Sequence, residues 1–314
     1  MLTTGATSLQ IHLRELPLDK CSEFWGPAHH EISPFEKLKI LSVTGGVPRY
    51  LEELRWDRSA EQNLLDMGYH HAGILFTEFD AIFSDLFRSR THTFSEILVQ
   101  VRNRHATAAE LAQRLGRPRG GTLSQDLDEL VEADFLTRDT NWNIGKQKEE
   151  RLGHYRVSDN YVRFYLKYIE PHHNTVLKGK MKALPSGWTS ILGLQFENLV
   201  SNNSSGLLKA IDLDPRDVVW SGSYVQTPTT RRGGCQIDYL IQTQHRVLYV
   251  CEVKFSVEKI GSSVIKEVAE KSRKLVKPRG FSVRHVLIHV NGVTEQVEWE
   301  NFFSDIVDFG QLLS

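Results

Sequence analysis

The chain has 314 residues, of which 40% are hydrophobic and 25% are charged, an average composition for globular proteins that excludes a disordered or fibrous chain. Its 38 basic and 39 acidic side chains give a formal net charge of -1, so overall charge does not indicate a nucleic-acid partner. The length favours two or three domains, and we expect three.

Cysteine spacing and hydropathy point to a reducing, aqueous environment. Cys21, Cys235 and Cys251 have no CxxC spacing, so neither a disulfide framework nor a zinc site is predicted. No run approaches the roughly 18 apolar residues that a membrane span needs, and the first residues lack a signal-peptide pattern. We therefore expect a cytoplasmic protein with no membrane partner.

Residues 1–87 are predicted to form a small helical unit. From Ile32 onward the apolar spacing is that of helices, and Gly45-Gly46 followed by Pro48 interrupts it. The chain contains no GxxxxGK[ST] motif, which in P-loop proteins cradles nucleotide phosphates. The chain alone is therefore not expected to be an ATPase.

Residues 88–171 have the pattern of a winged helix and a following helix. A short capped helix, a turn with glycines and a second helix precede two predicted strands near 135–138 and 154–157. The second helix is predicted to bury one face, which carries Leu123, Leu127 and Leu130. An aromatic helix then ends before Pro171.

The winged-helix pattern suggests one set of DNA contacts at the start of the second helix. The candidate side chains are Arg117, Arg119, Thr122, Ser124 and Gln125. The same helix carries acidic residues on its exposed face, which would repel a phosphate backbone: Asp128, Glu129 and Glu132. A protein-docking or spacer role for this unit therefore remains open.

Residues 172–187 are predicted to be a linker, and residues 188–314 a separate domain. The linker lies between Pro171 and Pro185 and has few bulky apolar groups. The last domain shows the order α-β-β-β-α-β, so the predicted fold class is a mixed α/β protein.

The last domain contains the cluster that carries candidate chemistry. Alternation along the strand places Glu252 and Lys254 on the same side, following an apolar row. Asp238 lies on the preceding strand, across a tight turn, where it can approach Glu252. Burying such charges is unfavourable unless they pair or bind an ion. Glu197, in the helix that opens the domain, could join the cluster.

Two converging carboxylates suit a hard cation, so Asp238 and Glu252 are predicted to bind Mg²⁺ or Mn²⁺. Lys254 would help to activate a metal-bound water and offset the charge of a pentavalent phosphorus transition state, with Glu197 assisting. This set predicts phosphodiester hydrolysis. The competing interpretation is an ordinary ion-paired strand end.

Basic residues follow the candidate catalytic strand, where a DNA backbone would have to lie. They include four that we predict to contact DNA: Lys271, Lys274, Lys277 and Arg279. Lys271 could also extend the catalytic site. A solvated helix face is the competing interpretation. The adjacent histidine pairs carry no metal-site spacing. The tryptophans are expected to be packing residues: Trp56, Trp142, Trp188, Trp220 and Trp299.

Several of these motifs together resemble a known family. Gly234 to Leu240 followed by Cys251 to Lys254 resembles the D…ExK core of PD-(D/E)XK nucleases, and Phe196-Glu197 resembles their first-helix glutamate. With TGGVPRYLEEL at Thr44 and YRVSDNYVRFYLKYIEP at Tyr155, the chain resembles the C-terminal portion of an archaeal-type P-loop ATPase family. The resemblance implies a helical lid, a winged helix and a nuclease-like domain.

One part of the family pattern is missing, namely the nucleotide-binding module with its phosphate loop. The expected function is a DNA-binding, Mg²⁺-dependent nuclease-like protein. The alternative is a catalytically inactive regulatory or adaptor portion that works on DNA with a P-loop ATPase subunit or module.

Overall fold

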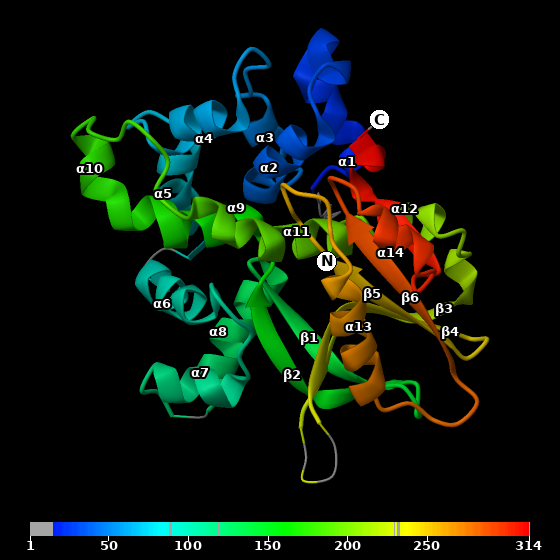
Figure 1. The fold of residues 1–314 in the computed structure, drawn as a ribbon. Coiled ribbons are helices and arrows are strands. Elements are labelled where there is room, and N and C mark those ends of the chain that lie inside the picture. The colour runs from blue at the N-terminus through cyan, green and yellow to red at the C-terminus, as the bar shows by residue number, and fades with distance from the viewer. Residues whose placement is uncertain (1–14, 88–89, 119, 229, 231–232, 314) are drawn as a thin grey trace, which may run out of the picture.

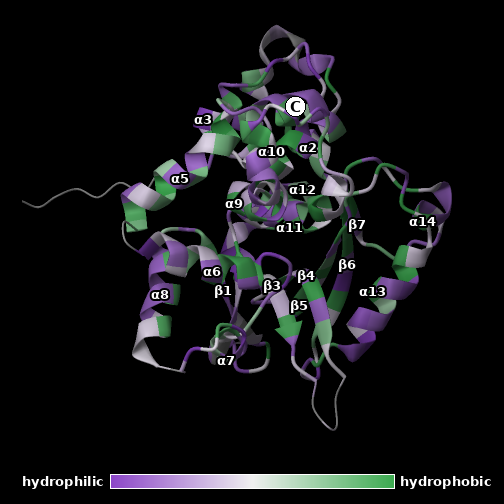
Figure 2. Cartoon of the chain, turned by 90° about the vertical axis from the view of Figure 1, so that its left-hand side faces the viewer, coloured by the Kyte–Doolittle hydropathy of each residue, from purple (hydrophilic) through white to green (hydrophobic). Residues whose placement is uncertain are grey.

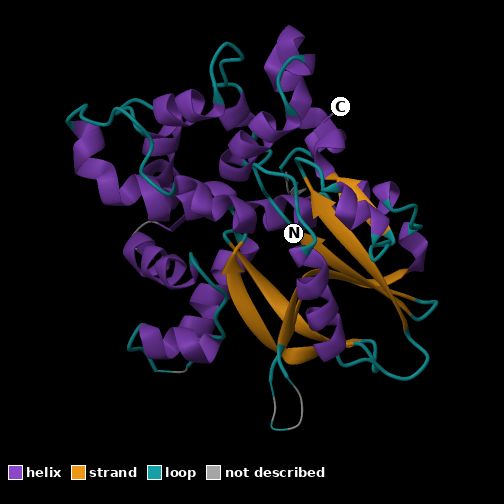
Figure 3. Ribbon diagram, in the orientation of Figure 1, coloured by secondary structure: helices purple, strands orange, loops and turns teal. Residues whose placement is uncertain are grey.

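The computed structural model describes residues 15–313 except 88–89, 119, 229 and 231–232. Helices predominate in the N-terminal and middle parts of the chain, and a sheet forms the core of the C-terminal part (Figure 3). The protein is therefore a mixed α/β structure, as its sequence predicts. No described helix is both long and apolar enough to cross a membrane.

The N-terminal region is helical, and local capping signals set its boundaries. Ser33 accepts a hydrogen bond from the Glu36 backbone and Pro34 is the first helical residue, which together begin α2. Gly45 ends α2 with φ of 60°, a conformation that glycine adopts readily. The helices are α1 (Leu18–Cys21), α2 (Pro34–Thr44), α3 (Pro48–Leu51), α4 (Ala60–Gly68) and α5 (Ile74–Phe87), with a 3₁₀ segment over Ser22–His30.

Three helices and a hairpin form the middle part. They are α6 (Thr91–Val101), α7 (Ala108–Arg114), α8 (Gly121–Glu132), β1 (Leu136–Asn143) and β2 (Lys148–Val157). A capping box between Thr107 and Glu110 begins α7. The apolar face predicted for α8 is confirmed, since Leu123, Leu127 and Leu130 are all buried.

The segment after the hairpin is more helical than its sequence indicates. It contains α9 (Asn160–Phe164), a π-helical turn (Tyr165–Ile169), a 3₁₀ turn (Glu170–His172) and α10 (His173–Leu177). The last of these lies inside the segment predicted to be a linker. Val176 is fully buried there, so packing stabilises a helix for which local composition gives little signal.

A five-stranded sheet with the order β3-β4-β5-β6-β7 organises the C-terminal part. The first three strands are antiparallel, whereas β5, β6 and β7 are parallel. The strands are β3 (Val218–Gln226), β4 (Cys235–Thr243), β5 (Val247–Val253), β6 (Ser282–His289) and β7 (Asp305–Asp308). The helices are α11 (Leu192–Asn202), α12 (Ser204–Ala210), α13 (Ser263–Lys274) and α14 (Glu295–Trp299).

Helices cover both faces of this sheet (Figure 1). On one face Val268 of α13 and Val297 of α14 share a buried cluster with Leu248 and Val250 of β5. On the other face Phe196 of α11 shares a buried cluster with Cys251 and Val253, which alternate with Leu248 and Val250 along β5. The outer side of α13 is hydrophilic, and the strands beneath it are largely hydrophobic (Figure 2).

The N-terminal helices contribute to two different cores. Leu18, Trp25 and Leu41 belong to the cluster that covers one face of the C-terminal sheet. Leu64 and Phe83, further along the same region, belong to the cluster of the middle part. Residues 15–87 therefore bridge the middle part and the sheet.

The β1–β2 hairpin also packs on the C-terminal sheet. Trp142 of β1 stacks on Trp220 of β3, with ring centroids 5.3 Å apart, and its Nε1 donates to Gln242 Oε1 at 2.7 Å. Trp188 is buried as well, as the sequence predicts. For Trp56 and Trp299 that prediction is wrong, because they are 60% and 74% exposed.

Candidate active site

The two candidate metal-binding carboxylates lie side by side on neighbouring strands. Tyr239 of β4 pairs with Cys251 of β5 in antiparallel register, which places Asp238 opposite Glu252. Glu252 is only 2% exposed. Asp238 Oδ2 accepts a hydrogen bond from the Val253 backbone at 2.9 Å, which fixes the carboxylate against the end of β5.

Lys254 lies on the same side as Glu252, as alternation along the strand predicts. Its Nζ is 3.0 Å from Glu252 Oε1 and 3.0 Å from Glu267 Oε2 on α13. Burial acts to lower the pKa of Lys254, but these two carboxylates outweigh it and hold the pKa above its ordinary value. Lys254 is therefore a cation in this arrangement.

Lys271 of α13 completes the cluster. Its Nζ lies 2.6 Å from Glu252 Oε2 and 3.4 Å from Asp238 Oδ1, so one ammonium bridges both carboxylates. Both acids outweigh burial and raise the pKa of Lys271. From the sequence, Lys271 is expected to contact DNA and could also extend the site. The four-residue spacing from Glu267 to Lys271, which puts both on one helix face toward β5, was the available signal.

Glu197 of α11 is electrostatically linked to the same cluster. Burial, followed by the charge of Asp238, raises the pKa of Glu197 to about 8. Arg156, Arg163 and Lys271 act in the opposite direction. Glu197 is therefore largely protonated at neutral pH, and no hydrogen bond joins it to Asp238 or Glu252 in the described structure.

A buried polar network holds α11 in place. Gln195 Nε2 donates to the Asn160 carbonyl at 2.7 Å, and Asn198 Nδ2 donates to Asn160 Oδ1 at 2.9 Å. Arg163, which is fully buried, donates to Gln195 Oε1 at 2.9 Å. The Ser-Asp-Asn-Tyr-Val-Arg stretch at the start of α9 therefore positions the helix that carries Glu197.

The carboxylates have the chemistry of a divalent-cation site. Burial, and then the charge of Glu252, raises the pKa of Asp238, so a bound cation would relieve an unfavourable pair of charges. Mg²⁺ is commonly held by one or two carboxylates and several waters, which matches Asp238 and Glu252. The Lys271 ammonium occupies the point between them and would have to move aside. Within the described residues, no group of three or more His, Cys, Asp or Glu side chains is arranged for a metal.

The residues predicted to contact DNA at the start of α8 differ in how accessible they are. Arg117 donates to Glu96 Oε2 at 2.7 Å and lies 3.6 Å from Asp126 Oδ2, so its charge is already compensated. Ser124 and Gln125 are exposed. Arg119 lies outside the described residues.

The predicted contacts near α13 are more accessible. Lys274 forms a surface pair with Glu270, at 2.7 Å. Lys277 and Arg279, in the loop between α13 and β6, are exposed and form no ion pair with any described residue. The accessible positive charge therefore lies in the loop after α13, near the start of β5, where Ser282 N donates to Arg246 O at 2.9 Å.

Comparisons with known proteins add little to this geometry. No profile of a known protein family matches the chain. A protein of Methanocaldococcus jannaschii described as uncharacterized protein MJECL04 is 26% identical over 195 residues, which are 60% of this chain and 41% of that protein. This chain thus spans less than half of that relative. A crystal structure of protein VC1899 from Vibrio cholerae is 12% identical and has a TM-score of 0.32, covering 76% of this chain and 55% of that one.

Proposed function

We propose that the C-terminal part is a metal-dependent nuclease that hydrolyses DNA phosphodiester bonds. The supporting observation is a cluster of four charged side chains between α13 and the ends of β4 and β5. Its members are Asp238, Glu252, Lys254 and Lys271. The elements around it follow the order α11, α12, β3, β4, β5, α13, β6, which contains the α-β-β-β-α-β order expected from the sequence with α12 in addition. The carboxylates of Asp238 and Glu252 would hold Mg²⁺ or Mn²⁺.

In the proposed reaction, the oxygen of a water molecule forms a bond to phosphorus while the bond from phosphorus to one sugar oxygen breaks. The attacking water loses a proton to solvent, and the departing sugar oxygen gains one. The bound metal ion would lower the pKa of the attacking water and stabilise charge on the phosphoryl oxygens. Lys254, held as a cation, would stabilise the additional negative charge of the transition state. Asp238 and Glu252 would orient the site.

We also propose how DNA reaches this point. The helices α6 to α8 and the β1–β2 hairpin have the element order of a winged helix. The tip of the hairpin is packed on β3, and Arg117 is paired with acidic side chains. The exposed Lys277 and Arg279 are therefore the better anchors for the phosphate backbone.

The proposal is tested by incubating the protein with supercoiled plasmid and with single-stranded, duplex and branched DNA, in Mg²⁺ and in Mn²⁺. Cleavage that disappears in Glu252→Gln supports it. Glu258→Gln, an exposed acid beyond the strand, is the matched control. A wild-type protein that cleaves none of these DNAs with either metal contradicts the proposal.

One observation favours a second candidate function. The two lysines already neutralise Asp238 and Glu252, as they would in a nuclease-like domain that has lost its metal. In that case the chain would be an inactive regulatory or adaptor portion that works on DNA with a P-loop ATPase. Stable DNA binding without cleavage, together with capture of a P-loop ATPase from the source cells, supports this alternative.

A further inference from the structure

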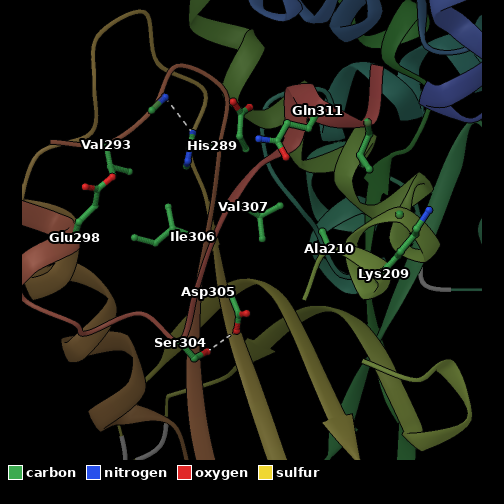
Figure 4. A pocket seen from close by; sticks show the side chains of 14 residues that line it. Lys209, Ala210, His289, Val293, Glu298, Ser304, Asp305, Ile306, Val307 and Gln311 are labelled. Carbon is green, nitrogen blue, oxygen red and sulfur yellow. Dashed lines mark hydrogen bonds between the residues drawn. The ribbon is translucent and has the colours of Figure 1, made fainter. Parts of the chain in front are cut away.

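The edge of the sheet farthest from β3 is formed by β7, which borders a large groove. The groove has a volume of about 790 Å³ and runs the length of the strand, from Ser304 to Asp308. Figure 4 shows Glu298 and His289 on one side of β7, with Lys209 and Ala210 on the other. Thus α14 and α12 flank an open strand edge. The strand order separates this edge from the carboxylate cluster.

The backbone of β7 offers unused hydrogen-bonding groups to this groove. Ser304 N donates to His285 O of the neighbouring strand at 2.8 Å. Lys254 N donates to Ile288 O, so Ile288 faces β5 and its neighbour Leu287 faces β7. Leu287 lies opposite Ile306, and a residue in a parallel ladder bonds to the two residues that flank its partner, so Asp305 and Val307 face β6. The N–H and C=O groups of Ile306 and the N–H of Asp308 consequently point away from the sheet, and no described backbone group is seen to pair with them. Such an edge is a template for another strand.

The groove is acidic. Glu298, Asp305 and Asp308 line it, against the single lysine Lys209. None of the four forms an ion pair with any residue that the structure describes. Asp305 and Asp308 accept only local hydrogen bonds, from Ser304 Oγ and the Gly310 backbone.

A buried imidazole adds a directional donor. His289, at the end of β6, lines the groove and is 5% exposed. Its Nδ1 accepts a hydrogen bond from the Gly292 backbone at 3.1 Å, so the proton of the neutral ring resides on Nε2. This Nε2–H has no partner among the described residues. A ligand in the groove would supply a carbonyl acceptor for it.

The helix that carries the groove-lining Glu298 also carries an exposed aromatic residue. Trp299 follows Glu298 at the end of α14 and is 74% exposed, which is unusual for a residue with so much apolar surface. Exposed aromatics beside polar grooves often anchor protein partners.

We propose that the β7 groove binds an extended, lysine- or arginine-rich segment of another polypeptide, which adds to the sheet as a sixth strand. The backbone of Ile306 and the N–H of Asp308 supply the pairing groups, and the three carboxylates select for positive charge. A second copy of this chain is a poor occupant. Pairing of two copies through β7 would bring two acidic grooves together, and the contact of like charges is unfavourable.

The probe for this proposal is a fluorescein-labelled peptide of alternating lysine and valine, titrated with the full chain and followed by anisotropy. Saturable binding is expected, and it should weaken about tenfold for Asp305→Lys with Glu298→Lys. The matched control is Glu52→Lys with Asp85→Lys, which makes the same charge change on exposed acids elsewhere. A peptide of the same charge with proline at every third position should bind at least about tenfold more weakly, because it cannot form a strand.

Hydrogen exchange locates the bound peptide. The amides of Ile306 and Asp308 should exchange more slowly when the peptide is bound, whereas those of β3 at the opposite edge should not change. The proposal is overturned if the wild type does not bind the peptide, or if a glutamate–valine peptide binds equally well. Binding without protection of β7, or a dimer of the protein that forms through β7, also overturns it. All these measurements are made without metal, so they are independent of DNA cleavage.

Discussion

The Nζ atom of Lys271 lies 2.6 Å from Oε2 of Glu252, which makes a lysine the internal counter-ion of the candidate metal site. Glu252 is almost completely buried, so its charge requires a partner at all times. When a divalent cation binds, Lys271 must withdraw from the carboxylates. The same ammonium would then be available to a phosphate bound nearby.

The first prediction concerns Lys271→Met. Without metal this variant should be less stable by about 3 kcal/mol, because it leaves the two neighbouring carboxylates with Lys254 as their remaining counter-ion in the cluster. Its affinity for Mn²⁺ should rise, because the competing ammonium is gone. Urea unfolding and calorimetry measure the two effects. Lys274→Met, which removes a surface pair on the same helix, should change stability by less than about 0.5 kcal/mol. Unchanged Mn²⁺ affinity in Lys271→Met would show that the cluster is only a structural ion pair.

The second prediction concerns Lys254→Ala. Cleavage should fall about 100-fold or more, whereas Mn²⁺ and DNA affinity should stay within about threefold of the wild type. The reason is that Lys254 acts on the transition state and the carboxylates hold the ion. Glu267→Gln, which removes the second partner of Lys254, is the control and should retain most activity. Equal losses of cleavage and metal binding would assign Lys254 a structural role.

The third prediction concerns the path of DNA. Lys277→Gln with Arg279→Gln should reduce the slope of log affinity against log salt by about 2, since each residue neutralises one phosphate. Arg117→Gln should leave the slope unchanged, because Glu96 and Asp126 already neutralise that guanidinium. Filter binding over a range of salt concentrations measures both slopes. The opposite pattern would make α8 the DNA anchor.

The fourth prediction concerns the packing of the hairpin on the sheet. Trp142→Ala should lower the free energy of unfolding by about 3 kcal/mol, because it removes the stacking on Trp220 and leaves Gln242 without its donor. Trp56→Ala, at an exposed position, should change it by less than about 0.5 kcal/mol. Urea titration followed by circular dichroism measures both. Equal small effects would mean that the hairpin packing contributes little stability.

The fifth prediction concerns pH. Burial raises the pKa of Asp159, the N-cap of α9, from 3.8 to about 6. The protonated folded form is therefore favoured, and stability from this group is present below pH 3.8 and lost as the pH rises through about 6. An asparagine side chain at this position would keep the capping oxygen without the charge. Asp159→Asn should therefore gain roughly 2 kcal/mol over the wild type above that range, and little below it. Urea titrations across this range test it, with Asp85→Asn as the exposed control. A constant difference would exclude titration of Asp159 as the cause.

Local patterns predicted the elements of the candidate site, and tertiary packing decided its electrostatics. Alternation in β5 was sufficient to place Lys254 beside Glu252, since period-two geometry is local. The four-residue spacing puts Glu267 and Lys271 on one face of α13, but the contact of Lys271 with Glu252 also depends on how α13 packs on the sheet. The contact between Trp142 and Gln242 joins residues far apart in sequence, so it was not foreseen. The strand β7 was also missed, because four residues carry too little periodicity.

The placement of the N-terminal helices has a consequence for how the chain folds. The backbone of Leu18 donates to Asn203 Oδ1 at 2.9 Å, and α1 lies against the segment Phe309–Leu313 at the other end of the described chain. During synthesis, Leu18 and Trp25 must therefore remain without their final apolar partners until the ribosome has delivered the sheet. The middle part can fold earlier from contacts within its own cluster. Until release, the exposed N-terminal helices are the segment that a chaperone would recognise.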